Sequence, residues 1–302
     1  MRFLNLAFCS LITSLTIFEP AMGAELVGTL RKIKESGVIT LGQRDSSIPF
    51  SYTADSSGQS IGYSQDIQLR IVEAIQRHLD LPYLKPRFNL VTSQTRIPLV
   101  LNGTVDLECG STTNNPERGR QVDFSVGIFS ATTKFLTKKD SSYYDFSDLA
   151  GKNVVTTAGS TSERLLRSMN ADEKMGMFII SAKDIGESYQ ILETGRAVAF
   201  MLDDAALAGE RAKAKNPDDW VLRGSPQSSE IYGCMMRKND SDFKKLVDDT
   251  IRELYTSGEI TSIYDKWFNK PIPPNGVNLN FAMTPALKEL INNPTDKPAT
   301  DK

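Results

Sequence analysis

The sequence predicts an α/β protein made of two lobes, and three observations lead to this prediction. Short β-rich runs alternate with amphipathic helical runs, the alternation occurs twice, and a late strand follows the second set. A length of 302 residues with 40% hydrophobic residues is enough for two globular domains. Such alternation is typical of mostly parallel sheets with helices on both faces.

The first residues predict export. Arg2 precedes an apolar run over residues 4–18, and Ala21 and Gly23 supply small residues at a cleavage site. The run is shorter than the roughly 20 apolar residues that span a membrane. We therefore interpret residues 1–23 as a signal peptide that is cleaved near Gly23.

The first set of elements follows this segment. We expect strands at 38–41, 88–91 and 105–109, with a helix beginning at Ser64 between the first two. Apolar residues recur along one stripe of this helix, which predicts that it covers a sheet. The stripe consists of Ile67, Ile71, Val72, Ile75 and Leu79.

The second set follows Gly151 and repeats the pattern. It contains expected strands at 153–157, 177–181 and 197–202, with helices from about Ser162 and Asp184 and over 204–213. A strand at 232–236 and an amphipathic helix after it then complete the first lobe, so the chain crosses between lobes twice.

These elements divide the chain into four parts. Residues 24–132 and 231–270 form lobe 1, residues 133–230 form lobe 2, and residues 1–23 are the signal peptide. Residues 271–302 are Pro- and Asn-rich and predict an extended C-terminal arm. A ligand is expected between the lobes, where strands end and helices begin.

Composition and missing motifs exclude several functions. Thirty-five basic and 37 acidic residues are spread along the chain and leave a net charge of −2, which argues against a nucleic-acid partner. The only histidine, His78, lies on the first long helix far from any nucleophile motif, and no phosphate-binding glycine pattern is present. Neither a metal site nor a cofactor is expected. Beyond the signal peptide, Cys109 and Cys234 form either a disulfide or two buried thiols.

Polar residues at the ends of the expected strands are candidates for ligand binding. Arg44, Ser111, Thr113, Thr161 and Asp203 occupy such positions. Each also has a structural alternative. Ser160, Thr161 or Ser162 would serve as a helix cap with Glu163 behind it, Asp203 would cap the helix over 204–213, and arginines such as Arg44, Arg96 and Arg118 are commonly solvated.

Several motifs resemble the polar amino-acid binding proteins of ABC importers, solute-binding protein family 3. They begin with residues 111–118, Ser-Thr-Thr-Asn-Asn-Pro-Glu-Arg, followed by Val-Asp-Phe-Ser at 122–125. Further matches are Gly-Tyr-Ser-Gln-Asp at 62–66, Leu-Ala-Gly-Lys at 149–152 and Tyr-Gly at 232–233. The segments 92–98, 108–113 and 208–215 resemble the glutamate/aspartate-binding branch. Together they cover essentially the whole mature chain.

The resemblance implies a periplasmic binding protein-like fold with a double-crossing hinge. It implies a monomer in the periplasm that delivers an acidic amino acid to a membrane permease. Arg118 and Thr113 would hold the ligand's α-carboxylate together with the main chain at Thr161, which suits a guanidinium fork and a helix N-terminus. Asp203 and Ser111 would hold the α-ammonium.

The resemblance assigns the ligand's side chain to the other end of the pocket. Arg44 and Arg96, with Ser93, would bind the second carboxylate and reject neutral ligands, because a buried cation without a partner costs about 3 to 5 kcal/mol. Ile185 departs from the pattern, since the branch has a ligand-holding histidine here. Either the arginines suffice, or the pocket suits another polar amino acid.

Two alternatives use the same fold. An exported dehydratase of the cyclohexadienyl type would need a cleft acid, and Glu108 is the candidate because strand alternation turns it away from the Val105, Leu107 and Cys109 face. A structural ion pair or a hydrogen bond to the backbone is the stronger expectation for this carboxylate. A sensor module is the other alternative, but the lack of a transmembrane or kinase segment argues against a covalent sensor and leaves a separately encoded receptor as partner. Since binding without catalysis is the stronger hypothesis, we expect no enzyme.

Overall fold

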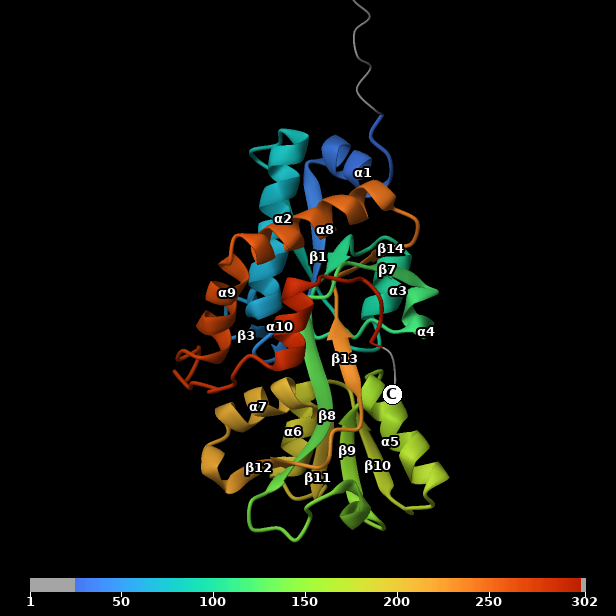
Figure 1. Ribbon diagram of the computed structural model, residues 1–302, viewed down its shortest axis with the longest axis vertical. Helices are drawn as coiled ribbons and strands as arrows, with labels where there is room; N and C mark the ends of the chain where they lie inside the picture. The colour runs from blue at the N-terminus through green and yellow to red at the C-terminus, as the bar shows by residue number, and fades with distance from the viewer. Residues whose placement is uncertain (1–24, 300–302) are drawn as a thin grey trace, which may run out of the picture.

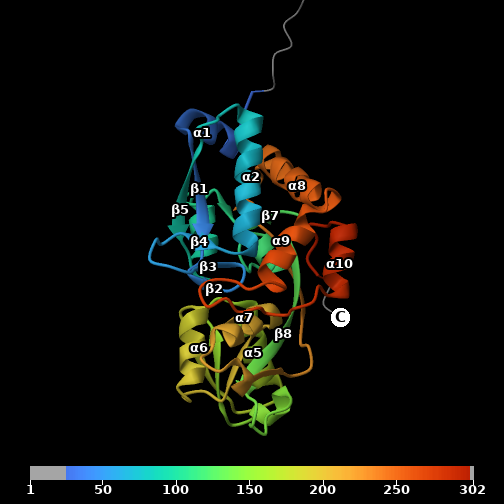
Figure 2. The same ribbon diagram turned by 90° about the vertical axis from the view of Figure 1, so that its left-hand side faces the viewer.

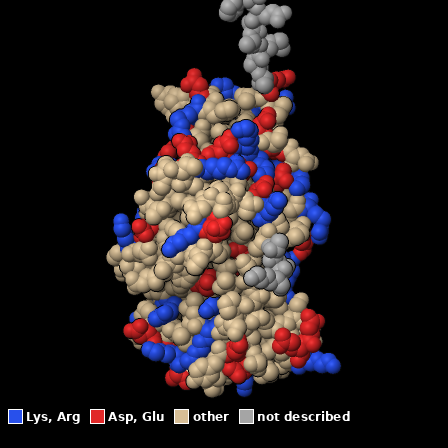
Figure 3. Space-filling model, viewed as in Figure 1, with Lys and Arg blue, Asp and Glu red and all other residues tan. Residues whose placement is uncertain are grey.

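The computed structural model describes residues 25–299 and shows an α/β molecule with two lobes, one above the other (Figures 1 and 2). The expected signal peptide and its cleavage site lie outside the described residues. No helix within residues 25–299 has the length and apolarity required to cross a membrane. Lysine, arginine and acidic side chains are interspersed over both lobes on the face shown in Figure 3.

Lobe 1 is built on a five-stranded sheet in the order β5-β1-β6-β14-β7. β1 (Val38–Gln43) lies parallel to β5 (Lys85–Leu90) and β6 (Leu107–Glu108). β14 (Met235–Arg237) is antiparallel to β6 and to β7 (Val122–Phe124). A smaller sheet is formed by β2 (Ser46–Ser47), β3 (Ser51–Thr53) and β4 (Ser60–Ile61).

The helices of lobe 1 cover this sheet. The expected stripe holds, since Ile67, Ile71 and Ile75 of α2 (Tyr63–Leu79) have no exposed surface. α2 packs against α8 (Ser241–Thr256) and α9 (Glu259–Phe268), which come from the far end of the chain (Figure 2). The remaining helices are α1 (Gly28–Ser36), α3 (Arg96–Leu101) and α4 (Pro116–Gly119).

Lobe 2 is built on a sheet in the order β10-β9-β11-β8-β12. Its strands are β8 (Phe129–Lys138), β9 (Asn153–Thr157), β10 (Phe178–Ala182), β11 (Ala199–Asp203) and β12 (Trp220–Arg223). One face packs against α6 (Ile185–Glu193) and α7 (Asp204–Lys213), and the other against α5 (Thr161–Asp172). Two short 3-10 helices, η1 (Phe146–Leu149) and η2 (Pro217–Asp219), complete the lobe.

Two strands connect the lobes. The first half of β8 pairs with β13 (Ser229–Tyr232), while its second half pairs with β11 and β12 inside lobe 2 (Figure 1). Phe129 and Tyr232, at the lobe 1 end of this pair, stack with ring centroids 5.7 Å apart. Both rings belong to the buried core of lobe 1, which therefore anchors the two crossings.

Three details differ from the expectations. The expected strand over 232–236 is two strands, β13 and β14, and the expected strand over 105–109 is reduced to β6. Part of the expected extended arm is a helix, α10 (Pro285–Asn292), which begins with Thr284 as cap and Pro285 in its first turn. Leu287 and Leu290 of α10 are buried against lobe 1, which explains the helix.

The two cysteines that sequence reasoning left undecided form a disulfide. Cys109 follows β6 and Cys234 precedes β14, so the bond joins neighbouring segments of lobe 1 that are 125 residues apart in sequence. Both are buried.

Candidate functional site

The predicted site residues of lobe 1 follow the carboxyl ends of its strands. Arg44 comes directly after β1, while Ser111 and Thr113 follow β6, which is the neighbour of β1. Ser93 lies in the loop after β5, and Arg96 is the first residue of α3. Because β1, β5 and β6 are parallel, their carboxyl ends bring these residues to one edge of the sheet.

Lobe 2 contributes Thr161, at the start of α5, and Asp203, at the end of β11. Ser160 is the cap of α5, since its hydroxyl accepts from the Glu163 main-chain N–H at 3.0 Å. Asp203 precedes α7 but makes no capping hydrogen bond, so the capping alternative for Asp203 is wrong. Its carboxylate instead accepts from the hydroxyls of Ser162, at 3.2 Å, and Tyr232.

A small pocket lies between the lobes at this point, with a cavity volume of about 10 Å³. This is far below the roughly 300 Å³ of an open small-molecule site, so the two lobes leave little free space between them here. Ile185, Leu202 and Ala206 form an apolar wall on the lobe 2 side. The predicted site residues that line the pocket are Ser93, Arg96, Ser111, Thr113, Thr161 and Asp203.

Arg44 does not line this pocket but is buried beside its Arg96 end. Its side chain is 1% exposed, and within residues 25–299 none of its three guanidinium nitrogens has a hydrogen-bond acceptor. Burial, and then the charge of Arg96, lower the pKa of Arg44 to about 10. A buried guanidinium without hydrogen-bond acceptors costs free energy, and an anionic group close to it would lower that cost.

Arg96 and Glu108 share this end of the site. Arg96 donates to the Ser111 carbonyl at 3.1 Å and to the Thr112 hydroxyl, and burial lowers its pKa. Glu108 is fully buried and accepts from the Thr112 hydroxyl at 2.9 Å. Its negative charge acts on both Arg44 and Arg96. Glu108 thus has a structural hydrogen bond, as expected, but its partner is the Thr112 hydroxyl and not the backbone.

Arg118 lies beside Thr113 but, unlike Thr113, does not line the pocket. It lies in α4, donates to the Thr113 carbonyl at 2.9 Å, and reaches across to the Gly159 carbonyl of lobe 2 at 3.1 Å. Burial, and then the charge of Arg96, lower the pKa of Arg118 to about 9. Its guanidinium thus contacts both lobes.

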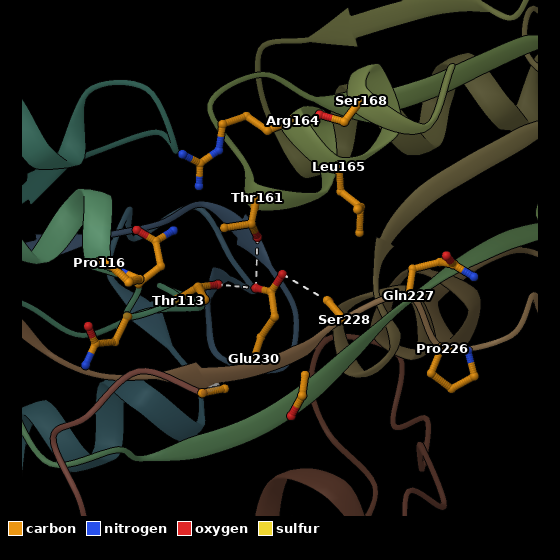
Figure 4. A pocket seen from close by; sticks show the side chains of 14 residues that line it. Thr113, Pro116, Thr161, Arg164, Leu165, Ser168, Pro226, Gln227, Ser228 and Glu230 are labelled. Atoms are coloured by element: carbon orange, nitrogen blue, oxygen red, sulfur yellow. Dashed lines mark hydrogen bonds between the residues drawn. The ribbon is translucent and has the colours of Figure 1, made fainter. Parts of the chain in front are cut away.

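Sequence reasoning missed two residues close to the site, Glu230 and Tyr232 of β13. Glu230 is 5% exposed and accepts from the hydroxyls of Thr113 and Thr161 (Figure 4). Burial and then the Glu230 charge raise the pKa of Asp203 well above its ordinary value, and burial and then Asp203 raise the pKa of Tyr232. Their position could have indicated them, since both lie on the strand that returns the chain to lobe 1 and therefore pass between the lobes.

The chain is similar to known proteins over almost its whole length. Residues 39–270 match the model of the bacterial extracellular solute-binding proteins, family 3. The L-glutamate/L-aspartate-binding protein of Pseudomonas aeruginosa is 64% identical over 99% of both chains. The glutamate/aspartate import solute-binding protein of Salmonella typhimurium is 56% identical over 92% of this chain and 90% of its own.

Solved structures are similar to the chain as well. A mutant of the arginine-binding protein of T. maritima matches with a TM-score of 0.69 and 28% identity over 80% of this chain and 99% of that chain. An ancestral arginine-binding protein, bound to glutamine, matches with a TM-score of 0.69 and 27% identity over 77% of this chain and 98% of its own.

Proposed function

The chain belongs to family 3 of the bacterial extracellular solute-binding proteins, and from this membership we propose that it captures glutamate and aspartate for an ABC importer. Two relatives that are more than half identical over nine-tenths or more of this chain carry these two ligands in their names. The proposal places the protein in the periplasm as a monomer, with its signal peptide removed near Gly23, and gives it a membrane permease as partner.

Buried Arg44 is the observation that carries the proposed ligand class. Its guanidinium lies beside Arg96, and the charges of Glu108, Asp45 and Asp184 act on it, but within residues 25–299 none of its nitrogens has a hydrogen-bond acceptor. A second carboxylate on the ligand supplies that acceptor. A ligand with a neutral side chain leaves the buried guanidinium unpaired, which costs several kcal/mol.

The ligand's head group is bound at the other end. Arg118 binds the α-carboxylate, and Thr113 and Thr161 add donors from the two lobes. Asp203 accepts from the α-ammonium together with Ser111, and this added positive charge offsets the burial that raises the Asp203 pKa. These contacts serve any free amino acid.

The side-chain end selects among amino acids. Arg44, Arg96 and Ser93 bind the side-chain carboxylate, and Ile185 gives only apolar contact from lobe 2. Glutamate and aspartate differ by one methylene, which is worth about 1 to 3 kcal/mol. Both are therefore ligands, and the same argument places amides well below them.

Closure around the ligand follows from its contacts to both lobes. A ligand that binds the closed form more tightly than the open form shifts the population toward closure. In this proposal residues 25–132 with 231–270 move as one lobe and residues 133–230 as the other, while residues 271–299 remain with the first. The two crossings of β8 and β13 provide the hinge.

The enzyme alternative has no support from the relatives. Those of Pseudomonas aeruginosa and Salmonella typhimurium are named for binding and import, not for catalysis. Glu108, the acid that motivated the alternative, is buried and hydrogen-bonded to Thr112. The protein is thus a binding protein rather than an enzyme.

Calorimetric titration of the purified mature protein tests the ligand class. Glutamate and aspartate are expected to bind at micromolar concentration or below, and glutamine and asparagine at least about a hundredfold more weakly, because only the acids bring a second charge to Arg44. Histidine, arginine and cystine serve as comparisons. Tight binding confined to a non-acidic amino acid contradicts the proposal.

A further inference from the structure

Glu230 links both lobes to the hinge. It lies on β13, and one oxygen of its carboxylate accepts from Thr113 of lobe 1 and from Thr161 of lobe 2, the latter at 2.8 Å (Figure 4). The other oxygen accepts from the Ser228 hydroxyl at 3.3 Å. None of the motifs described under Sequence analysis contains this carboxylate.

The two threonines separate Glu230 from the ligand pocket. They line the small pocket between the lobes and also a second, more open pocket beside the hinge, of about 570 Å³. Glu230 lines only this hinge pocket. It therefore acts on a ligand through Thr113 and Thr161.

A threonine hydroxyl carries a single proton. Where that proton is donated to Glu230, it is not available to a carboxylate of the ligand. The main-chain N–H groups of Thr113 and Thr161 remain, and neither has an acceptor within residues 25–299. The Thr161 N–H also lies at the positive end of α5, where anions are favoured.

We propose that Glu230 is a positioning residue for the ligand's α-carboxylate, which is read by Arg118 and by the main-chain N–H groups of Thr113 and Thr161. The inference rests on the proposed function, since it takes a free amino acid as the ligand. Glu230 holds the two threonine side chains, and through them it sets the spacing of two donors that belong to different lobes.

One ion pair also joins the two lobes, and neither of its residues lines the pocket between the lobes. Glu117 of α4 forms an ion pair with Arg164 of α5, and the two side chains are 55% and 47% exposed. This pair provides a matched control. Its loss affects contact between the lobes but does not affect the hydroxyls of Thr113 and Thr161.

The test compares Glu230→Ala, Glu230→Gln and Glu117→Ala in the full mature chain, using glutamate and its α-amide as probes. Glutamine at position 230 keeps one oxygen for both threonines and turns its amide group toward Ser228, so affinity is expected to stay within about threefold of wild type. Glu230→Ala removes both hydrogen bonds and is expected to weaken glutamate about tenfold or more.

The ratio of the two affinities distinguishes positioning from a general effect on closure. In Glu230→Ala the preference for glutamate over its α-amide is expected to fall about fivefold or more, because only glutamate carries the misplaced carboxylate. Glu117→Ala and Glu230→Gln leave the ratio unchanged. Equal weakening of both ligands by Glu230→Ala, or equal damage from Glu230→Gln, overturns the inference.

Thr161 gives a second measurement that does not depend on the stability of Glu230→Ala. Thr161→Val loses the hydroxyl and is expected to lower the preference for glutamate over its α-amide. Thr161→Ser keeps the hydroxyl and is expected to keep this preference. Equal ratios in the two variants overturn the inference. A wild-type protein that does not bind glutamate contradicts the proposed function instead.

Discussion

Arg44, Arg96 and Arg118 are unusual among arginines because each is at least 95% buried. Their neighbours Glu108, Glu230 and Asp203 are buried carboxylates, so charge of both signs is concentrated around one small pocket. Most arginines in proteins are solvated instead. Burying these charges costs free energy of desolvation, and a charged ligand in the pocket would offset part of that cost.

Replacing Arg44 tests which end of the site it serves. Arg44→Ala is expected to weaken glutamate by about 2 to 5 kcal/mol and glutamine by less than about 1 kcal/mol, because only glutamate loses a charged partner. Titration calorimetry of both ligands measures the difference. Arg87→Ala, at an exposed arginine of lobe 1, is the control. Equal weakening of both ligands assigns Arg44 to the scaffold.

Glu210 of α7 gives a pH dependence in the ligand-free protein. Its side chain has no exposed surface, and burial raises its pKa to about 7 although Lys213 lies 2.6 Å away and opposes the shift. The pKa of Glu210 in the folded protein is above its unfolded value of 4.5, so the contribution of Glu210 to stability is greatest below pH 4.5. That stability is lost as the pH rises through about 7.

Glu210→Gln is therefore expected to stabilise the protein above pH 7 and not at pH 4. The gain is about 3 kcal/mol at pH 8, since the amide avoids the cost of a buried charge. Urea unfolding at both pH values measures it. Asp218→Asn, at a side chain that is 97% exposed, is the control. A gain that is equal at both pH values contradicts the assignment.

At the residue scale, the sequence predicted which residues lie at the site better than it predicted their hydrogen-bond partners. Arg44, Thr113 and Asp203 were predicted because they follow strands, and the topology of a parallel sheet explains why strand ends meet. The contact between Glu230 and the two threonines depends on how the lobes are oriented across the hinge. No local pattern contains that information.

At the scale of elements, α7 determines how closely the lobes approach. Gly209 of α7 faces the main chain of Ile48 in lobe 1, and a Cβ at Gly209 would lie 2.4 Å from the Ile48 carbonyl oxygen. Residues 272–275 of the C-terminal arm lie beside this contact, where Figure 2 shows α7 at the boundary between the lobes. The absence of a side chain allows the close approach.

Gly209→Ala is expected to weaken ligand binding while leaving stability unchanged or higher. Alanine favours the helix by about 0.5 to 1 kcal/mol over glycine, but its methyl group clashes with lobe 1 in the closed form. Glutamate affinity is expected to fall about tenfold or more, as measured by calorimetry alongside thermal unfolding. Gly119→Ala, where a Cβ meets nothing within 4 Å, is the control.

The elements themselves were largely predictable. The helix over 204–213 and the strand over 153–157 have the bounds expected from periodicity. α10 was missed because a segment of eight residues has only two buried positions, and the preceding prolines dominate its local pattern. The division between β13 and β14 was missed because residues 232–236 read as one apolar strand until their partners β8 and β6 are known.

At the scale of the whole molecule, the disulfide closes a loop of 125 residues. Chain-entropy arguments and measured cases give such a bond about 2 to 5 kcal/mol of stability. Reduction, or the double substitution Cys109→Ala with Cys234→Ala, is expected to lower the free energy of unfolding by this amount while glutamate affinity changes little. Urea unfolding with and without reductant checks it, and an unchanged midpoint contradicts it.

The family model and the structure differ in extent. The match to the family model ends at residue 270, whereas α10 and the segment after it remain packed against lobe 1 and the hinge. The Thr295 carbonyl accepts from the Gly127 N–H at 2.8 Å, and the Asp296 carbonyl accepts from Asn114 at 2.7 Å. This arm thus contacts the segments next to the hinge strands from outside the residues that the family model matches.

The bond between Cys109 and Cys234 also determines what happens when the backbone is cut. All strands and helices of lobe 2 lie between the two cysteines, so the chain forms a covalent ring that carries this lobe. A protease that cleaves a loop of lobe 2 opens the ring but releases no fragment. The nicked molecule keeps both walls of its pocket on one covalent body, and it separates into two pieces only after reduction.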